Sequence, residues 1–216
     1  MRLNPGETQA TGWRVETLPD VVRRLREAAG GITGRPVVVA IDGRGGAGKS
    51  TLVERLRKTV PGSGVVHTDD IAWHHAFFDW VDLIVENVLR PLHRGGAVEF
   101  RPPAWAERGR PGAIRVAAGA GVVWVEGTGT LRQELAPWID ASIWVQGDLD
   151  EQERRMTARD GDSAARRRLL ADWLAEEVPL LLREQPWRKA TVVVAGTTVL
   201  DHDPDTEVVT AAPAAP

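Results

Sequence analysis

A short glycine-rich segment between a predicted buried strand and a predicted helix most constrains what this chain can fold into. Residues 37–41 read Val-Val-Val-Ala-Ile, a β-branched run of the kind that is buried in parallel sheets. The turn Gly43–Ser50 follows, and a helix is predicted from about Lys49 to Val60, ended by Pro61-Gly62. A strand, a tight turn and a helix in this order predict a parallel α/β unit with the turn at the carboxyl edge of the sheet.

This turn matches the complete pattern G-x-x-x-x-G-K-[ST], the P-loop or Walker A motif. Glycines permit the dihedral angles that aim backbone N–H groups at phosphate oxygens, and the helix N-terminus adds partial positive charge. We expect the loop to bind ATP, with Lys49 at the β- and γ-phosphates and the Ser50 hydroxyl on Mg²⁺. The predicted nucleotide-binding residues are Gly43, Gly45, Gly46, Ala47, Gly48, Lys49, Ser50 and Thr51.

The same turn also fits the dinucleotide-binding pattern G-x-G-x-x-G, at Gly43, Gly45 and Gly48. Asp69 lies 21 residues beyond Gly48, near the spacing of the acid that binds a ribose in dinucleotide folds. A dinucleotide loop does not need a Lys-Ser pair directly after its last glycine, whereas a triphosphate site uses both residues. A triphosphate site is therefore favoured, and a dinucleotide-dependent oxidoreductase stays open as an alternative.

Strand and helix patterns alternate along the rest of the chain. Further strands are predicted at 65–68, 122–125, 141–145 and 191–194, and helices at 18–29, 81–93, 148–160 and 164–184. This alternation predicts an α/β chain with the three-layer α/β/α P-loop NTPase fold, about five parallel strands and a helical lid.

We expect one domain over residues 1–201, with its core at 37–196 and a frayed tail, rich in proline and alanine, at 202–216. Residues 1–16 are polar and are predicted to be irregular. The segment 95–118 departs from the alternation and is predicted to be a small insertion with a hairpin.

Composition excludes several functional classes. The net charge of −3 argues against a nucleic-acid partner, which requires a strongly basic face. The absence of cysteine removes thiol catalysis, disulfides and cysteine-metal sites. No apolar run approaches the ~18 residues of a membrane span. We expect a cytoplasmic protein without a membrane partner, and a homo-oligomer stays open.

Three acidic positions follow predicted strands, where open α/β sheets bind their ligands. They are Asp42, the pair Asp69-Asp70, and Glu126. Glu126 is predicted to hold Mg²⁺ directly or through water, with capping of the next helix as the alternative. A carboxylate at Asp69 can accept the proton of a substrate hydroxyl, or can be a solvated turn residue. The sequence does not separate Asp69 from Asp70.

Together these residues resemble the uridine kinase group of P-loop small-molecule kinases. The segments that carry the resemblance are Val39–Leu52, His67–Trp73, Phe78–Leu92, Val122–Gly127, Arg154–Asp160 and Glu176–Gly196. It spans most of the chain and implies an ATP- and Mg²⁺-dependent enzyme with a nucleoside-like acceptor.

The resemblance also implies individual roles. Asp69 falls on the family's catalytic base, Asp79 on the acid that binds ribose hydroxyls, and Glu126 on the acid after the third strand. The family's Phe-Tyr after the base is replaced here by Ile71-Ala72. Its P-x-Y-D stretch is replaced by Pro-Pro-Ala-Trp, which keeps an aromatic residue but not the acid. We expect Asp79, Trp105 and Arg108 to bind the acceptor.

A dense run of arginines falls on the predicted lid at about residues 154–168. Arg155 and Arg159 are four residues apart and therefore share a helix face, from which they can clamp the transferred phosphoryl group. The alternative is a solvated face that pairs with neighbouring acids.

The predicted reaction is transfer of the ATP γ-phosphoryl group to a hydroxyl of a small molecule, foremost a nucleoside. A nucleotide-dependent regulatory ATPase without a small-molecule acceptor is the alternative. The guanine-reading pattern N-K-x-D is absent from the chain.

Overall fold

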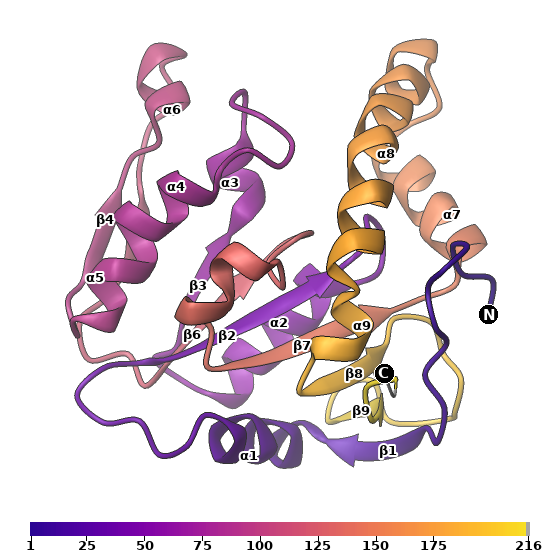
Figure 1. Cartoon of the computed structure of the whole chain (residues 1–216), viewed down its shortest axis with the longest axis horizontal. Helices are drawn as coiled ribbons and strands as arrows, with labels where there is room; N and C mark the ends of the chain where they lie inside the picture. The colour runs from indigo at the N-terminus through magenta and orange to yellow at the C-terminus, as the bar shows by residue number, and fades with distance from the viewer. Residues whose placement is uncertain (215–216) are drawn as a thin grey trace.

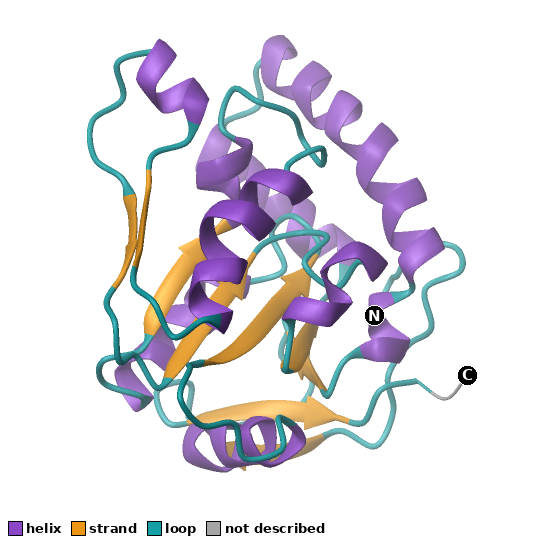
Figure 2. Ribbon diagram, turned by 60° about the vertical axis from the view of Figure 1, so that its left-hand side comes forward, coloured by secondary structure: helices purple, strands orange, loops and turns teal. Residues whose placement is uncertain are grey.

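The computed structural model describes residues 1–214 and has a central sheet with helices on both faces (Figures 1 and 2). Its strands are β1 (Arg14–Thr17), β2 (Val37–Gly43), β3 (Gly64–His67), β4 (Val98–Phe100), β5 (Ile114–Val116), β6 (Val122–Glu126), β7 (Ala141–Gln146), β8 (Val192–Ala195) and β9 (Glu207–Ala211). Its helices are α1 (Leu18–Ala28), α2 (Lys49–Thr59), α3 (Thr68–Ala72), α4 (Val81–Ile84), α5 (Arg90–His93), α6 (Pro103–Glu107), α7 (Leu149–Asp160), α8 (Ala164–Glu184) and α9 (Pro186–Lys189), with a π-helical turn η1 (Val85–Leu89) and a 3₁₀ helix η2 (Gln133–Trp138).

The central sheet has the strand order β1-β9-β8-β7-β2-β6-β3. The run β8-β7-β2-β6-β3 is parallel throughout, which confirms the five predicted parallel strands. In dinucleotide folds of order 3-2-1-4-5-6, the first strand of the parallel sheet lies beside the second. Here the first parallel strand, β2, lies between β6 and β7, which are the third and fourth. The sheet order therefore does not support the dinucleotide alternative.

Successive side chains of β2 face two different helical layers. Val37, Val39 and Ile41 pack with α1 and α2 on one face of the sheet. On the opposite face Val38 packs with α3, α4 and α5, and Ala40 packs with α8 and α9. This alternation confirms the three-layer α/β/α arrangement, because a strand buried on both sides is covered by helices on both faces (Figure 2).

The helix predicted over 81–93 is present but changes its geometry in the middle. It consists of α4, the π-helical turn η1 and α5 in direct succession. Pro91 has no N–H to donate to the carbonyl four residues earlier, which explains a local departure from the α-helical ladder at this point.

The prediction of a frayed tail at 202–216 is wrong for residues 207–211. These residues form β9, which pairs antiparallel with β8 and β1 and buries Val208 and Val209. The domain boundary at residue 201 is therefore also wrong, because the sheet extends to Ala211.

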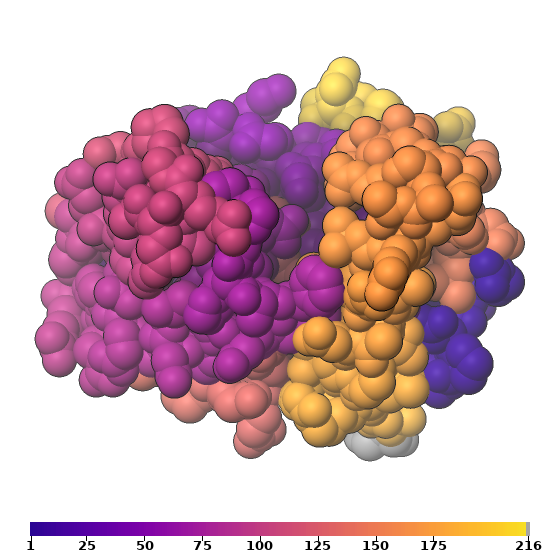
Figure 3. Space-filling model, turned by 90° about the horizontal axis from the view of Figure 1, so that it is seen from above, coloured from indigo at the N-terminus to yellow at the C-terminus, as the bar shows by residue number. Residues whose placement is uncertain are grey.

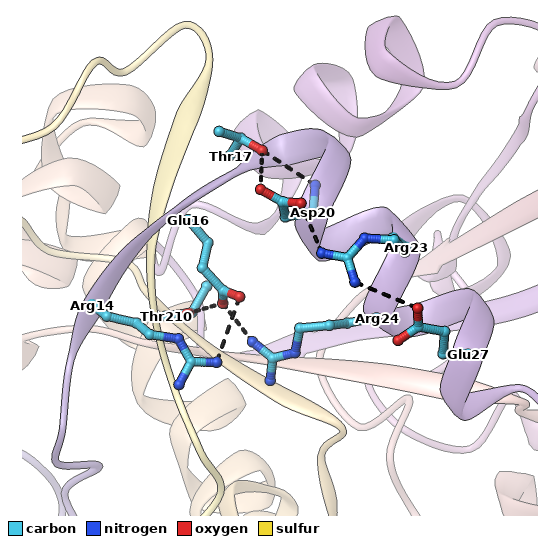
Figure 4. Close-up of polar contacts among 8 residues, drawn as sticks. All are labelled: Arg14, Glu16, Thr17, Asp20, Arg23, Arg24, Glu27 and Thr210. Atoms are coloured by element: carbon cyan, nitrogen blue, oxygen red, sulfur yellow. Dashed lines mark hydrogen bonds and ion pairs between the residues drawn. The ribbon is translucent and has the colours of Figure 1, made fainter.

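The prediction that residues 1–16 are irregular is likewise wrong at its end, where β1 begins at Arg14. Figure 4 shows how β1 is fixed: the Glu16 carboxylate accepts hydrogen bonds from Thr210 of β9 and Arg24 of α1. Thr17 caps α1 through its side chain, which accepts from the Asp20 N–H at 3.3 Å.

The predicted hairpin in the insertion is present as β4 and β5, with α6 between them. This insertion and the long helix α8 project from the same side of the molecule (Figure 1). Seen from above, the surface is hollowed between the magenta part of the chain and the orange part that contains α8 (Figure 3). Within residues 1–214, none of the helices combines the length and the apolar character that crossing a membrane requires.

Candidate active site

The phosphate loop Gly43–Ser50 joins the carboxyl end of β2 to the N-terminus of α2. Gly46 and Gly48 have φ angles of +73° and +98°, a region in which side chains are strained. A Cβ atom on Gly46 would lie 2.6 Å from the Gln152 carbonyl oxygen of α7. The first N–H groups of α2 have no partner within the helix, so this loop offers the backbone donors that a phosphate group requires.

Lys49 lies inside the loop. Its Nζ donates to the carbonyl oxygens of Gly43 at 2.9 Å and Arg44 at 3.0 Å, and to Thr128 Oγ1 at 3.3 Å. The side chain is almost fully buried. Thr128 also donates to the Gly43 carbonyl at 2.9 Å and was not predicted, because nothing in its local sequence marks it. The ammonium group is therefore held within the loop by three oxygen acceptors.

Glu126 at the end of β6 joins the phosphate loop to β3. Its Oε2 lies 3.3 Å from Ser50 Oγ and 2.7 Å from His67 Nδ1. Burial raises the pKa of Glu126, but the His67 hydrogen bond and the charge of Lys49 outweigh burial, so the pKa is lowered. The next helix, η2, begins at Gln133, so Glu126 does not cap it and the capping alternative is wrong.

His67 is a site residue that the sequence reasoning missed. It ends β3 as Glu126 ends β6, so its position at a strand end was a usable signal. The hydrogen bond to Glu126 raises the pKa of His67. When it is protonated, His67 adds a positive charge to the site beside that of Lys49.

The oxygen donors of Ser50 and Glu126 fit Mg²⁺, which prefers hard oxygen ligands and is commonly bound through one or two protein groups plus phosphate oxygens. Among residues 1–214, no group of three or more His, Asp or Glu side chains is arranged to hold a metal ion. The protein would therefore supply only part of the coordination shell.

The structure separates Asp69 from Asp70, which the sequence did not. Asp70 forms an ion pair with Arg110 Nη2 at 2.5 Å. Asp69 instead lies in the field of Lys49 and Glu126. Asp69 is exposed, yet the protein around it removes enough water to raise its pKa; the charge of Lys49 opposes the rise, and the charge of Glu126 adds to it. The charges of both acids help to raise the pKa of His67, but only the Asp70 carboxylate is held by an ion pair to the insertion.

The two predicted lid arginines lie on α7 and differ in their surroundings. Arg155 Nη1 donates to the Gly196 carbonyl at 2.8 Å and lies 3.5 Å from the Gly46 carbonyl of the phosphate loop. Arg159 is exposed and pairs with Asp160 at 2.8 Å, and only its charge reaches the site, where it opposes the raised pKa of Asp69. Arg155 therefore contacts the phosphate loop, and Arg159 does not.

Other arginines of the lid lie on a solvated face and pair with neighbouring acids, as the alternative prediction held. Arg154 pairs with Glu151, and Arg167 pairs with Asp162 at 2.8 Å. Arg166, Arg167 and Arg168 are exposed at the start of α8.

The residues predicted to bind the acceptor differ in their exposure to solvent. Asp79 is exposed between buried Phe78 and Trp80, and Arg108 is exposed at the end of α6. Trp105 is 5% exposed, and its Nε1 donates to the Asp70 carbonyl at 2.8 Å. This burial leaves Trp105 little surface on which an acceptor ring could stack.

Arg110 covers a face of the Trp105 ring, which was predicted to bind the acceptor. Its guanidinium carbon lies 3.7 Å from the centre of the Trp105 ring and 5.2 Å from that of Trp73. This stacking was not predicted, because no local pattern around Arg110 marks it. Trp173 of α8 packs on Phe77 and Phe78, with ring centres 5.2 and 4.7 Å apart.

Asp42, the acid after β2, is a structural residue of the site. Its carboxylate accepts three backbone N–H groups, from Gly43 at 2.7 Å, Gly129 at 2.9 Å and Leu131 at 2.8 Å. Burial raises the pKa of Asp42 to about 6 although these donors oppose the rise. Asp42 therefore ties the start of the phosphate loop to the loop after β6.

A pocket of about 270 Å³ opens beside the far end of the phosphate loop. Its walls come from α2 (Thr51, Leu52 and Arg55), from the ends of β7 and β8, and from α7. His202 and β9 complete it, so the segment that was predicted to be a tail contributes to the site.

No family model matches the chain, and no curated protein matches it. Solved structures do. A protein named as a possible uridine kinase, from Bacillus stearothermophilus, is 19% identical with a TM-score of 0.51, and the match covers 81% of this chain and 98% of that one. A protein named as a candidate fructose transport system kinase, from Silicibacter sp. TM1040, is 20% identical with a TM-score of 0.52, over 79% and 89% of the two chains.

The chain has the P-loop kinase fold. The resemblance to the uridine kinase group is thus confirmed at the level of the fold. At such identities the comparison extends to the P-loop kinase fold alone, and the roles of individual residues stay predictions.

Proposed function

We propose that the protein is an ATP-dependent phosphotransferase that moves the γ-phosphoryl group to a hydroxyl of a small, nucleoside-like molecule. The observation that carries this proposal is one cluster. Lys49, Ser50, Glu126 and Asp69 come together at the carboxyl ends of β2, β6 and β3, beside a complete phosphate loop.

The phosphate loop would hold the nucleotide, with its backbone N–H groups and Lys49 binding the β- and γ-phosphates. Ser50 and Glu126 would hold Mg²⁺, which neutralises phosphate charge when bound. His67 keeps the Glu126 carboxylate in place through the 2.7 Å contact. Arg155 and Arg159 would stabilise the charge that develops on the transferred group.

Asp69 would accept the proton of the attacking hydroxyl. Its raised pKa makes it a stronger base than an ordinary aspartate, and the neighbouring positive charge of Lys49 keeps the ionised form accessible. Asp70 is not suited to this role, because Arg110 already occupies its carboxylate.

The pocket between α2, α7 and β9 is lined by Ala47 and Gly48 of the loop and by Thr51 of α2. A nucleotide whose phosphates run along the loop would place its base and ribose there. Leu52, Val145 and Val208 offer apolar contacts to a base, and Arg55 and His202 offer polar ones.

The acceptor would lie in the hollow between the magenta part of the chain and the orange part that contains α8 (Figure 3), with its hydroxyl directed to Asp69. One structural neighbour is named for uridine and another for fructose transport, and both compounds offer sugar hydroxyls. We propose that the acceptor carries such a hydroxyl. Asp79 would bind it, with Arg108 at the rim and the edge of the largely buried Trp105 beneath.

The test is a screen of acceptors. The protein is incubated with Mg·ATP and single nucleosides, sugars or vitamins, while ADP formation and the mass of the acceptor are followed. We expect one class to accelerate ADP formation and to gain the mass of one phosphoryl group. ATP hydrolysis at the same rate with and without every acceptor would support a regulatory ATPase instead.

A further inference from the structure

Glu177, in the middle of α8, contacts the phosphate loop from outside. Its Oε1 accepts a hydrogen bond from the Gly45 N–H at 3.1 Å, and its Oε2 accepts one from Arg44 Nη2 at 3.0 Å. The Glu177 side chain is 1% exposed. One carboxylate therefore binds the side chain of Arg44 and the backbone of Gly45, which are consecutive residues of the loop.

Arg44 has a second buried partner in the N-terminal segment. Its Nη1 lies 3.6 Å from Glu7 Oε2, and both side chains are almost fully buried. Gln146 at the end of β7 holds this segment, because its Nε2 donates to Glu7 Oε1 at 3.1 Å and its Oε1 accepts from the Ala10 N–H at 2.8 Å. A guanidinium between two buried carboxylates gives an ion cluster that costs much free energy to form and is strongly disrupted when one member is lost.

The hydrogen bond between Glu177 and the Gly45 N–H affects the part of the loop that would bind phosphate. Gly45 directly precedes Gly46, whose φ of +73° sets the turn of the loop. Within the loop, the Ala47 N–H is also taken, by the Arg44 carbonyl at 3.2 Å. The Gly45 and Ala47 N–H groups are thus engaged by the protein itself, and the N–H groups of Gly46 and Gly48 are left to face a ligand.

We propose that Glu177 is a positioning residue for the phosphate loop. Together with Arg44 it holds the loop in its phosphate-binding shape before any nucleotide arrives, and so makes α8 part of the nucleotide site. This inference rests on the proposed function for its purpose, but its structural content concerns the free protein.

Two variants and one control test it. Glu177→Gln keeps an oxygen that can accept from Gly45 but loses the charge, and Glu177→Ala loses both. In each variant Arg44 retains one carboxylate partner, Glu7, whose Oε2 lies 3.6 Å from Nη1, and circular dichroism checks that the variant is folded. Glu176→Gln alters the exposed neighbour on the same helix and is the control.

The first measurement is amide hydrogen exchange of the segment Gly43–Ser50 in the nucleotide-free protein. A charge-assisted hydrogen bond contributes enough that we expect about tenfold faster exchange or more in Glu177→Ala, a smaller change in Glu177→Gln and none in the control. Exchange in Glu177→Ala equal to that of the unaltered protein would overturn the inference, whatever the protein does with ATP.

The second measurement is the dissociation constant for Mg·ATP. We expect both Glu177 variants to bind more weakly in the same order as their exchange rates, while the control is unchanged. Tighter binding in the Glu177 variants would also overturn the inference, because the carboxylate would then compete with phosphate for the loop. If the unaltered protein does not bind Mg·ATP, the proposed function fails, and the exchange result still decides the role of Glu177.

Discussion

The carboxylate of Asp70 forms an ion pair with Arg110 at 2.5 Å, and this contact distinguishes it from its neighbour Asp69. Arg110 stands in the insertion, 40 residues further along the chain, and stacks on Trp105. The pair fixes one of two adjacent acids to the insertion and leaves the other to the phosphate loop.

Asp69→Asn is expected to keep Mg·ATP binding but to lower turnover by roughly 10²-fold or more, the usual contribution of a general base. Asp70→Asn is expected to lower turnover less, since it removes an ion pair outside the cluster. Steady-state kinetics with the acceptor from the screen compares the two. An exchange of their effects would assign the base to Asp70, and no effect in either would make Glu126 the next candidate.

The pH dependence of turnover follows from the raised pKa of Asp69. A base must be ionised, so turnover is expected to fall on acidification at a pH above the ordinary range of aspartate. Glu126, whose pKa is lowered, stays ionised through that range. A profile of kcat/KM against pH measures this fall. The residual activity of Asp69→Asn is expected to lack it, and an unchanged acidic limb in that variant would rule out Asp69 as its origin.

Arg→Lys at Arg155 or Arg159 is expected to lower turnover more than it weakens ATP binding. A planar guanidinium can bridge two phosphoryl oxygens, whereas a lysine ammonium is a point charge. An interaction made mainly in the transition state has that kinetic signature. Arg154→Lys, on the solvated part of the same helix, is the matched control. Unchanged kinetics at both positions would remove the lid arginines from the reaction.

Asp42→Asn is expected to destabilise the fold by about 2 kcal/mol, since an amide N–H₂ would face one of three backbone donors. The free energies of unfolding of the unaltered protein and the variant are compared at a pH well above 6, where the Asp42 carboxylate is ionised. Urea unfolding gives the free energy. The exposed Asp82→Asn is the control, and a change at Asp42 no larger than at Asp82 would contradict a structural role.

Much of the fold could be predicted because its signals are local. The β-branched run of β2, the motif after it and the alternation of strand and helix patterns define the parallel sheet. β1 could not be predicted in this way. It holds a single apolar residue, Val15, which is 38% exposed, and its pairing with β9 stabilises it. β9 does carry a short β-branched run, Val208-Val209-Thr210, which was not predicted to be a strand because alanine and proline dominate the residues after it.

The candidate site was predictable to the same extent. Lys49, Ser50 and Glu126 are marked by the motif and by a strand end, and the structure places them together. Arg110, Thr128 and Glu177 were missed because each acts across a long sequence separation; Glu177 lies 133 residues from Arg44. Trp105 was assigned an exposed role, because a single aromatic residue in a sequence does not reveal what covers it.

The most direct test of the account is a calorimetric titration of the unaltered protein and of Lys49→Ala with Mg·ATP, combined with their turnover. Lys49 contacts loop carbonyls and Thr128 rather than the hydrophobic core, so the variant is expected to fold. The account predicts binding and turnover by the unaltered protein and loss of tight binding and turnover in the folded variant. Near-normal affinity together with near-normal turnover in Lys49→Ala would contradict it.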